Sequence, residues 1–367
     1  MRLRSVLYFF PIFLIFLILI CIDFSDEYSP ILSRISKFQI ARQKTDKKYK
    51  ILVIMIVMDI EEAEKEYEVA LNSIRCYCKI QKYSFALIES RKYDKICTQK
   101  DFMFQRHCIF TEVMKSSKYD WMLFLDADMA VVNPNVRIEE YLSNHEIIFY
   151  DRFVNWEVAA GSYIAHNSQY TIDFLRKFAD FENYLPIDSF HGTDNGAIHV
   201  YFQQIFYPHL TESSKICLKI WEKSREYDDL YTFEACIRAI MGESKELGDG
   251  KIRILSKGTG WVRDIWLSDS EWNQQRDFML HGLKKSNMVS FSQGMLTNLI
   301  FTKFNWRNPF TSLFDLKKCE TNSENWKLKY NSDLIVSSTK IEKYLERKFV
   351  EVEKRKWKYM SLVSDYV

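Results

Sequence analysis

Residues 121–128 read W-M-L-F-L-D-A-D and carry more information about the fold than any other part of the chain. The five apolar residues predict a strand buried on both faces, as in a sheet covered by helices. The strand leads directly into Asp126 and Asp128, where ligands of open α/β sheets bind. Two neighbouring carboxylates need a compensating charge, and oxygen ligands favour Mg²⁺ or Mn²⁺. The alternative is an ordinary polar loop after a strand.

Strand and helix patterns alternate on both sides of this stretch. A continuous apolar run at residues 51–58 predicts the first buried strand. A helix, a strand and a helix are expected next, at residues 67–80, 83–88 and 102–116. Further strands are expected at residues 146–150 and 162–165, and further helices at 169–181 and 194–205. This order predicts an α/β fold with a mostly parallel sheet flanked by helices.

Length and composition are those of a globular protein, and large α/β enzymes reach this length as one domain. The chain has 367 residues, and its 27 Phe, 21 Tyr and 9 Trp provide for a sizeable core. Its 51 basic and 49 acidic residues give a formal charge of +2, so the overall charge predicts no nucleic-acid partner.

The first residues predict a membrane anchor. Residues 5–22 contain no charge and are long enough to cross a membrane as a helix. Arg2 and Arg4 precede them and acidic residues follow, so the positive-inside rule predicts a single-pass type II protein with the rest of the chain on the far side of the membrane. Such a chain enters the secretory pathway, and the Golgi or ER membrane is its expected location. A cleaved signal peptide and a secreted protein are the alternative.

The expected organisation follows from this anchor. Residues 1–4 form a cytoplasmic tail, 5–22 the transmembrane helix and 23–50 a polar stem. Residues 51–310 form the lumenal catalytic domain, and 311–367 a C-terminal extension with a charged amphipathic helix at 340–358. An oxidising lumen permits disulfides among the seven cysteines beyond Cys21, and this odd number leaves one unpaired. The pairing itself stays open.

Residues 123–134, L-F-L-D-A-D-M-A-V-V-N-P, resemble the D-x-D segment of nucleotide-sugar glycosyltransferases with the GT-A fold. The resemblance is closest to the retaining type that includes glycogenin and the fungal Golgi α-galactosyl- and α-mannosyltransferases. An uncharacterised family expanded in nematodes has a very similar core. The resemblance extends over residues 51–287 and implies a GT-A-type, Rossmann-like sheet. It also implies that Asp126 and Asp128 hold Mn²⁺ (or Mg²⁺) against the donor diphosphate, with Asp126 also close to the ribose.

A second segment, H-G-L-K at residues 281–284, resembles the H-x-G-x-x-K and H-G-x-K endings of these enzymes. The resemblance implies that His281 completes the metal sphere and that Lys284 contacts the donor phosphates. An imidazole beside two carboxylates suits Mn²⁺ better than Ca²⁺. A lone histidine at a strand end is more often structural, and Lys285 is an alternative to Lys284.

Two further segments resemble parts of the donor site. Ala160 and Gly161 resemble the A-G turn beside the donor sugar, where the backbone must come close. Asp194 and Asn195 resemble an acidic-plus-amide pair near the reacting carbon, which implies hydroxyl binding or transition-state stabilisation. An ordinary glycine before a strand and a helix N-cap are the respective alternatives.

Arg106 and Asp59 complete the predicted donor site. Related enzymes often place a basic residue toward the donor from the helix before the D-x-D strand, which implies this role for Arg106 or Lys100. Asp59 follows the first strand at the edge that binds the nucleoside. Either residue is equally compatible with a solvated surface position.

The expected activity is transfer of a hexose from a nucleotide diphosphate sugar, a UDP-sugar by analogy, to a hydroxyl of a glycan, glycoprotein or glycolipid. The resemblance implies retention of the anomeric configuration. A catalytically silent, membrane-anchored relative that binds sugar or a partner is one alternative. A haloacid-dehalogenase-like phosphatase is another, because its nucleophile loop also has a D-x-D pattern. Such a phosphatase also needs an acidic pair in the pattern G-D-x-x-x-D. Gly248-Asp249 matches only the start of this pattern, and Arg253 stands where the second aspartate is needed.

Overall fold

The computed structural model describes residues 48–209, 211–242, 245–289, 306–312, 314–319, 326 and 329–363, all within one compact unit that begins at Ala41. The predicted tail at 1–4, the predicted anchor at 5–22 and nearly all of the predicted stem lie outside these residues. None of the helices in the described part has the length and hydrophobicity of a membrane span.

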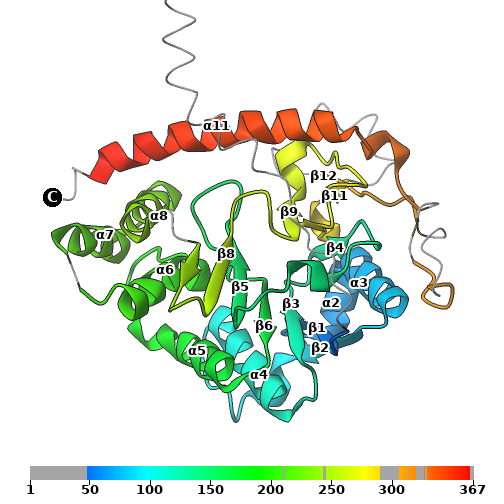
Figure 1. The fold of residues 1–367 in the computed structure, drawn as a ribbon, viewed down its shortest axis with the longest axis horizontal. Helices are drawn as coiled ribbons and strands as arrows, with labels where there is room; N and C mark the ends of the chain where they lie inside the picture. The colour runs from blue at the N-terminus through cyan, green and yellow to red at the C-terminus, as the bar shows by residue number, and fades with distance from the viewer. Residues whose placement is uncertain are drawn as a thin grey trace, which may run out of the picture. The chain divides into compact units, whose positions relative to one another are not determined.

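A seven-stranded sheet with the strand order β2-β1-β3-β6-β5-β8-β7 forms the centre of this unit (Figure 1). Its strands are β1 (Ile51–Val57), β2 (Ser84–Glu89), β3 (Trp121–Phe124), β5 (Ile147–Tyr150), β6 (Tyr163–His166), β7 (Glu246–Leu247) and β8 (Ile252–Leu255). The α/β architecture predicted from the sequence is confirmed, but the sheet is mixed because β6 and β7 run antiparallel to the other strands. The loop from β5 to β6 contains no crossover helix and forms an antiparallel bridge between Asp151 and Val158, so the chain returns in the opposite direction.

Helices cover the sheet. On one face, α4 (Phe102–Ser116), α5 (Gln169–Asp180) and α6 (Thr193–Phe206) enclose a core with the inward residues of β1, β3, β5, β6 and β8. Two outer helices, α7 (Glu212–Lys223) and α8 (Tyr227–Met241), extend the same core. Elsewhere α2 (Ile60–Glu66) packs against β2, and α3 (Glu68–Gln81) packs against β2 and β4.

Two smaller sheets follow the ends of the main strands. The first has the order β4-β10-β9, from β4 (Met129–Val131), β9 (Val262–Asp264) and β10 (Met279–His281). The second pairs β11 (Met288–Val289) with β12 (Trp306–Arg307). Short 3-10 helices are η1 (Ser90–Tyr93), η2 (Ile138–Tyr141), η3 (Phe181–Tyr184), η4 (Ile265–Ser268), η5 (Lys285–Asn287) and η6 (Ser332–Leu334).

The last helix, α11 (Ser338–Leu362), covers the charged helix predicted at residues 340–358. The Ser337 hydroxyl accepts a hydrogen bond from the backbone N–H of Lys340 and so caps its first turn. An apolar stripe is buried along one side of α11, which packs against α8 and η4. Figure 1 shows α11 running past α8. The stripe consists of Ile341, Leu345, Phe349, Val352 and Tyr359.

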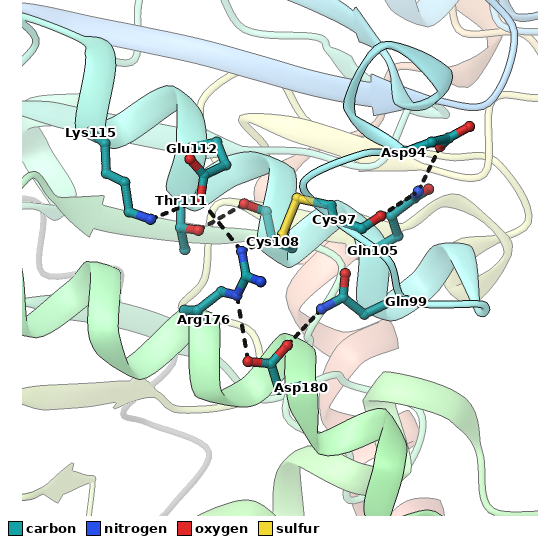
Figure 2. Close-up of a disulfide and its surroundings, with 10 residues drawn as sticks. All are labelled: Asp94, Cys97, Gln99, Gln105, Cys108, Thr111, Glu112, Lys115, Arg176 and Asp180. Atoms are coloured by element: carbon teal, nitrogen blue, oxygen red, sulfur yellow. Dashed lines mark hydrogen bonds and ion pairs between the residues drawn. A yellow bond between two sulfur atoms is a disulfide. The ribbon is translucent and has the colours of Figure 1, made fainter.

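The described residues contain three disulfides: Cys76–Cys319, which joins segments 243 residues apart, and the more local Cys97–Cys108 and Cys217–Cys236. Cys78 is buried and unpaired, in agreement with the odd number of cysteines beyond Cys21. Figure 2 shows Cys97–Cys108, which ties the loop before α4 to the helix itself. The Arg176 guanidinium on α5 lies 2.9 Å from the Cys108 sulfur, so the middle of α4 is in contact with both the preceding loop and α5.

Glu234 on α8 is an ionisable group without solvent contact. Its exposed fraction is 0%. Burial and the negative charge of Glu157 raise the pKa of Glu234 well above its ordinary value. The carboxyl group is therefore protonated in the folded protein at pH values where it is ionised in the unfolded chain.

We expect the Glu234→Gln variant to be more stable than the wild type at neutral pH. A raised folded-state pKa contributes stability below the unfolded pKa, and this contribution is lost as pH rises toward the folded pKa. Glutamine has no such titration, so its stability advantage should be small at pH 4 and larger at pH 8. Urea unfolding at both pH values measures it, with Glu222→Gln on the exposed face of α7 as the control. A variant less stable than the wild type at pH 8 would contradict the assignment.

Candidate metal centre

The two aspartates of the D-x-D sequence lie in the turn between β3 of the main sheet and β4 of the small sheet. β3 ends at Phe124, and the next backbone N–H, from Leu125, still donates to the Ile54 carbonyl at 3.0 Å. The N–H of Met129 donates to the Asp126 carbonyl at 3.2 Å and closes the turn. This is the carboxyl edge of the main sheet, where ligands of α/β sheets bind.

Pairing of β10 with β4 brings His281 to the same place. His281 lies opposite Met129 in the antiparallel register. The N–H groups of Gly282 and Leu283 donate to the Asp128 carbonyl at 3.1 and 2.9 Å. Backbone hydrogen bonds therefore fix His281 beside the D-x-D turn although the two segments are far apart in the sequence.

Asp126, Asp128 and His281 form a cluster that suits a divalent cation. Each offers one ligand atom, and the three atoms lie within 4.8 Å of one another. His281 Nε2 is 3.3 Å from Asp128 Oδ1, and Lys284 Nζ is 3.7 Å from Asp128 Oδ2. Two carboxylates and an imidazole fit Mn²⁺ or Mg²⁺, and an ammonium group beside them suits a phosphate.

At each member of the cluster, the charges of its neighbours oppose the effect of burial on the pKa. Burial would raise the pKa of Asp128, but the charges of His281 and Lys284 lower it to about 2. Burial would lower the pKa of His281, but the carboxylates of Asp128 and Asp264 raise it to about 10. At Asp126 burial raises the pKa, and the Arg106 charge opposes this effect.

Arg106 on α4 joins the cluster to a second buried carboxylate. Its side chain is buried, and its guanidinium pairs with Asp126 on one side and with Asp194 Oδ2 at 2.6 Å on the other. Asp194 is only 1% exposed, and the same oxygen lies 3.1 Å from His107 Nε2. Burial would raise the pKa of Asp194, but Arg106 and His107 hold it below its ordinary value. The Asp194 carboxylate therefore has both of these partners inside the protein.

The segment before β6 comes close to the first aspartate. A Cβ atom on Gly161 would lie 2.1 Å from Asp126 Oδ2, so any other residue at this position would force the Asp126 carboxylate to move. The neighbouring N–H of Ala160 donates to Asn195 Oδ1 at 3.0 Å, which ties the segment to the start of α6.

We expect Gly161→Ala to fold but to bind Mn²⁺ at least about tenfold more weakly, because the new methyl group forces the Asp126 carboxylate aside. Calorimetric titration with Mn²⁺ measures the affinity, and circular dichroism checks the fold. Gly250→Ala is the control for an added methyl group away from the cluster, since a Cβ there meets nothing within 4 Å and Gly250 lies in the hairpin between β7 and β8. Its φ of 77° disfavours alanine, so this variant should lose some stability but keep the wild-type Mn²⁺ affinity. Unchanged Mn²⁺ affinity in Gly161→Ala would show that the carboxylate position is not critical.

Asp59 has local partners outside the cluster. Its Oδ1 accepts a hydrogen bond from the Glu62 N–H at 3.0 Å and caps α2, and its Oδ2 pairs with Arg91. The bond from the Glu62 N–H and the Arg91 charge lower the pKa of Asp59. Asp59 follows β1 at the same sheet edge as Asp126, and its contacts are those of a helix cap.

The sequence leaves two choices of basic residue open, Arg106 or Lys100 and Lys284 or Lys285, and the members of each pair have different contacts. Arg106 pairs with Asp126, whereas the backbone of Lys100 donates to Glu182 at 2.9 Å. Lys284 approaches Asp128, whereas Lys285 begins η5.

Sequence reasoning missed three residues around His281 and Asp128. Asp264 Oδ1 lies 2.7 Å from His281 Nδ1, and the Trp266 ring centroid is 5.4 Å from that of His281. Tyr67 is close enough for Lys284 and Asp128 to influence its pKa, which burial raises. No motif marks these residues. Asp264 is the last residue of a three-residue strand, and such a strand is too short to show an alternating apolar pattern in the sequence.

Several solved structures are similar to this chain. A glycosyltransferase involved in the glycosylation of the major capsid of PBCV-1 shares 14% identity at a TM-score of 0.37, over 63% of this chain and 93% of that one. The apo form of the glycosyltransferase GlyE of Streptococcus pneumoniae TIGR4 shares 15% identity at a TM-score of 0.31, over 43% and 44%. A197 from STIV shares 12% identity at 0.23, over 35% and 68%. At these TM-scores the similarity does not bear on what this chain does.

The sequence itself was compared with curated proteins and with family models. No curated protein matches it. A family model described as "Protein of unknown function, DUF273" matches residues 74–298, which include the D-x-D turn, Asp194 and the His281–Lys284 segment.

Proposed function

This chain belongs to the DUF273 family, and we propose that it is a metal-dependent glycosyltransferase that moves a hexose from a nucleotide diphosphate sugar to an acceptor hydroxyl. The cluster of Asp126, Asp128 and His281 carries the proposal, because three ligand atoms within 4.8 Å of one another lie at the carboxyl edge of the sheet with Lys284 beside them. The resemblance of residues 123–134 and 281–284 to GT-A glycosyltransferases supports the same assignment.

The three side chains would hold Mn²⁺ or Mg²⁺. When bound, the cation acts as a Lewis acid that neutralises charge on the departing diphosphate, an effect worth several kcal/mol. The Lys284 ammonium adds a second positive charge for the phosphates, and its side chain is 41% exposed and free to reach them. Arg106 holds Asp126 in place from the buried side.

Asp194 and Asn195 act as positioning residues in this proposal. Asp194 is 1% exposed, and it holds Arg106 against Asp126. Asn195 holds the Ala160 N–H, which keeps Gly161 beside the Asp126 carboxylate. Both residues therefore influence the donor through Asp126.

The topology disfavours the phosphatase alternative. Asp249 lies in the hairpin between β7 and β8, which precedes β8 and so lies at the amino end of that strand. β8 runs in the same direction as β3, so Asp249 is at the opposite sheet edge from Asp126. Three strands, β6, β5 and β8, also separate β3 from β7 in the sheet order. The acidic pair that a phosphatase needs is therefore not assembled at the D-x-D turn.

The proposal extends to donor, acceptor and compartment. A UDP-sugar is the expected donor, and a glycan, glycoprotein or glycolipid is the expected acceptor, with retention at the anomeric carbon. Three disulfides suit an oxidising compartment, in agreement with a lumenal domain of a type II Golgi or ER protein or with a secreted protein.

A donor-hydrolysis screen of the purified protein tests this function. UDP- and GDP-sugars are incubated with Mn²⁺ or with EDTA, and the released nucleoside diphosphate is measured. We expect release from at least one UDP-sugar with Mn²⁺ and none with EDTA. Mn²⁺ binding without any turnover or transfer would favour the catalytically silent relative. Formation of an aspartyl phosphate from a phosphoester would favour the phosphatase.

A further inference from the structure

Asp264 lies behind His281, on the side away from the two D-x-D aspartates. It is the last residue of β9, and the parallel register of β9 and β10 places it directly opposite His281. Its Oδ1 is 2.7 Å from His281 Nδ1, while His281 Nε2 faces Asp128 Oδ1 at 3.3 Å. Each ring nitrogen of His281 therefore faces the carboxylate of a different aspartate.

Asp264 is itself held in place. Its side chain is 6% exposed, and the Arg152 guanidinium donates to its Oδ1 at 3.2 Å. The other end of the Arg152 guanidinium donates to Glu157 at 2.9 Å. A buried row of alternating charges thus runs from Glu157 through Arg152 and Asp264 to His281.

We propose that Asp264 is the positioning residue that turns His281 Nε2 toward the metal, and that it sets the metal affinity of the site. This inference rests on the proposed function, because it concerns the metal of that site. Accepting the proton of Nδ1 fixes both the orientation of the ring and the tautomer whose Nε2 carries the free lone pair. Loss of such an outer partner typically costs 10- to 100-fold in metal affinity.

A titration of the purified protein with Mn²⁺ tests the inference. Binding is measured by calorimetry and by the electron paramagnetic resonance signal of free Mn²⁺. We expect Asp264→Ala to weaken Mn²⁺ binding by about 10- to 100-fold. Asp264→Asn retains an acceptor oxygen and should fall between Asp264→Ala and the wild type.

Asp277→Asn is the matched control. Asp277 is a buried aspartate in the same region, but it pairs with Arg263 at 2.8 Å and not with His281. We expect this variant to lose stability and to keep the wild-type Mn²⁺ affinity. An equal loss of affinity in Asp277→Asn and Asp264→Ala would overturn the inference, because it would reflect a general disturbance of β9 and β10.

Nitrogen chemical shifts of His281 test the same point without a variant of Asp264. In wild-type protein loaded with Mg²⁺, a long-range proton–nitrogen spectrum assigned with His281→Gln should show the proton on Nδ1. A proton on Nε2, or wild-type Mn²⁺ affinity in Asp264→Ala, would overturn the inference alone. A wild-type protein that binds neither cation would overturn the proposed function and this inference together.

Discussion

Replacing Asp128 by asparagine is expected to lower metal-dependent donor turnover by about 10³-fold, since the metal contributes several kcal/mol and each 1.4 kcal/mol is a factor of ten. Asp128 is the member of the cluster that contacts both His281 and Lys284. Asparagine keeps the size of the side chain but removes the negative charge that a cation needs. The backbone carbonyl of Asp128, which holds Gly282 and Leu283, is unchanged, so the fold should remain.

Asp249→Asn is the matched control for this experiment. Asp249 is the other aspartate that a phosphatase assignment invokes, and asparagine tolerates its positive φ of 53°. Turnover in Asp249→Asn should equal that of the wild type. Undiminished turnover in Asp128→Asn would contradict the metal site, and loss of turnover in both variants would point to the phosphatase alternative.

Replacing Arg106 by methionine is expected to reduce the free energy of unfolding by about 3–5 kcal/mol, the range measured when one partner of a buried ion pair is removed. Arg106 is shared by Asp126 and Asp194, and Asp194 is 1% exposed. Without the guanidinium the Asp194 carboxylate stays buried with only the His107 ring and the Thr193 hydroxyl as partners among the described residues. Urea unfolding measures the loss.

A double variant separates the buried charge from lost packing. In Arg106→Met with Asp194→Asn the unpaired negative charge is gone, so at least half of the lost stability should return. Arg91→Met removes an arginine from an exposed pair with Asp59 and should change stability little, because its side chain is 60% exposed. Equal losses in the single and double variants would show that Arg106 stabilises the fold by packing alone.

The fold was predictable where apolar runs are long. Helix α4 begins and ends where the sequence predicts, and β1, β2, β5, β6, α3, α5 and α6 lie within two residues of their predicted positions. The antiparallel direction of β6 was missed, although the sequence predicts no helix between residues 150 and 162 and therefore no crossover between β5 and β6. Strands β9 and β10 have three residues each, and their pairing rather than their pattern defines them.

The site was predictable where motifs mark it. The D-x-D and H-G-L-K segments led to Asp126, Asp128, His281 and Lys284, and the structure brings these four together. The resemblance implies hydroxyl binding or transition-state stabilisation for Asp194, and this role stays a prediction; the structure shows its carboxylate in contact with Arg106 and His107. The role of Asp264 could not be predicted from the sequence. Its partner His281 is 17 residues away, on a strand that only the fold places beside it.

Calorimetric titration with UDP, in the presence and absence of Mn²⁺, tests the central claim most directly. The wild-type protein should bind UDP with Mn²⁺ and bind it at least tenfold more weakly with EDTA, while Asp128→Asn should bind it weakly in both conditions. UDP binding that is independent of Mn²⁺, or equal in the wild type and in Asp128→Asn, would contradict a metal–diphosphate site built from Asp126, Asp128 and His281.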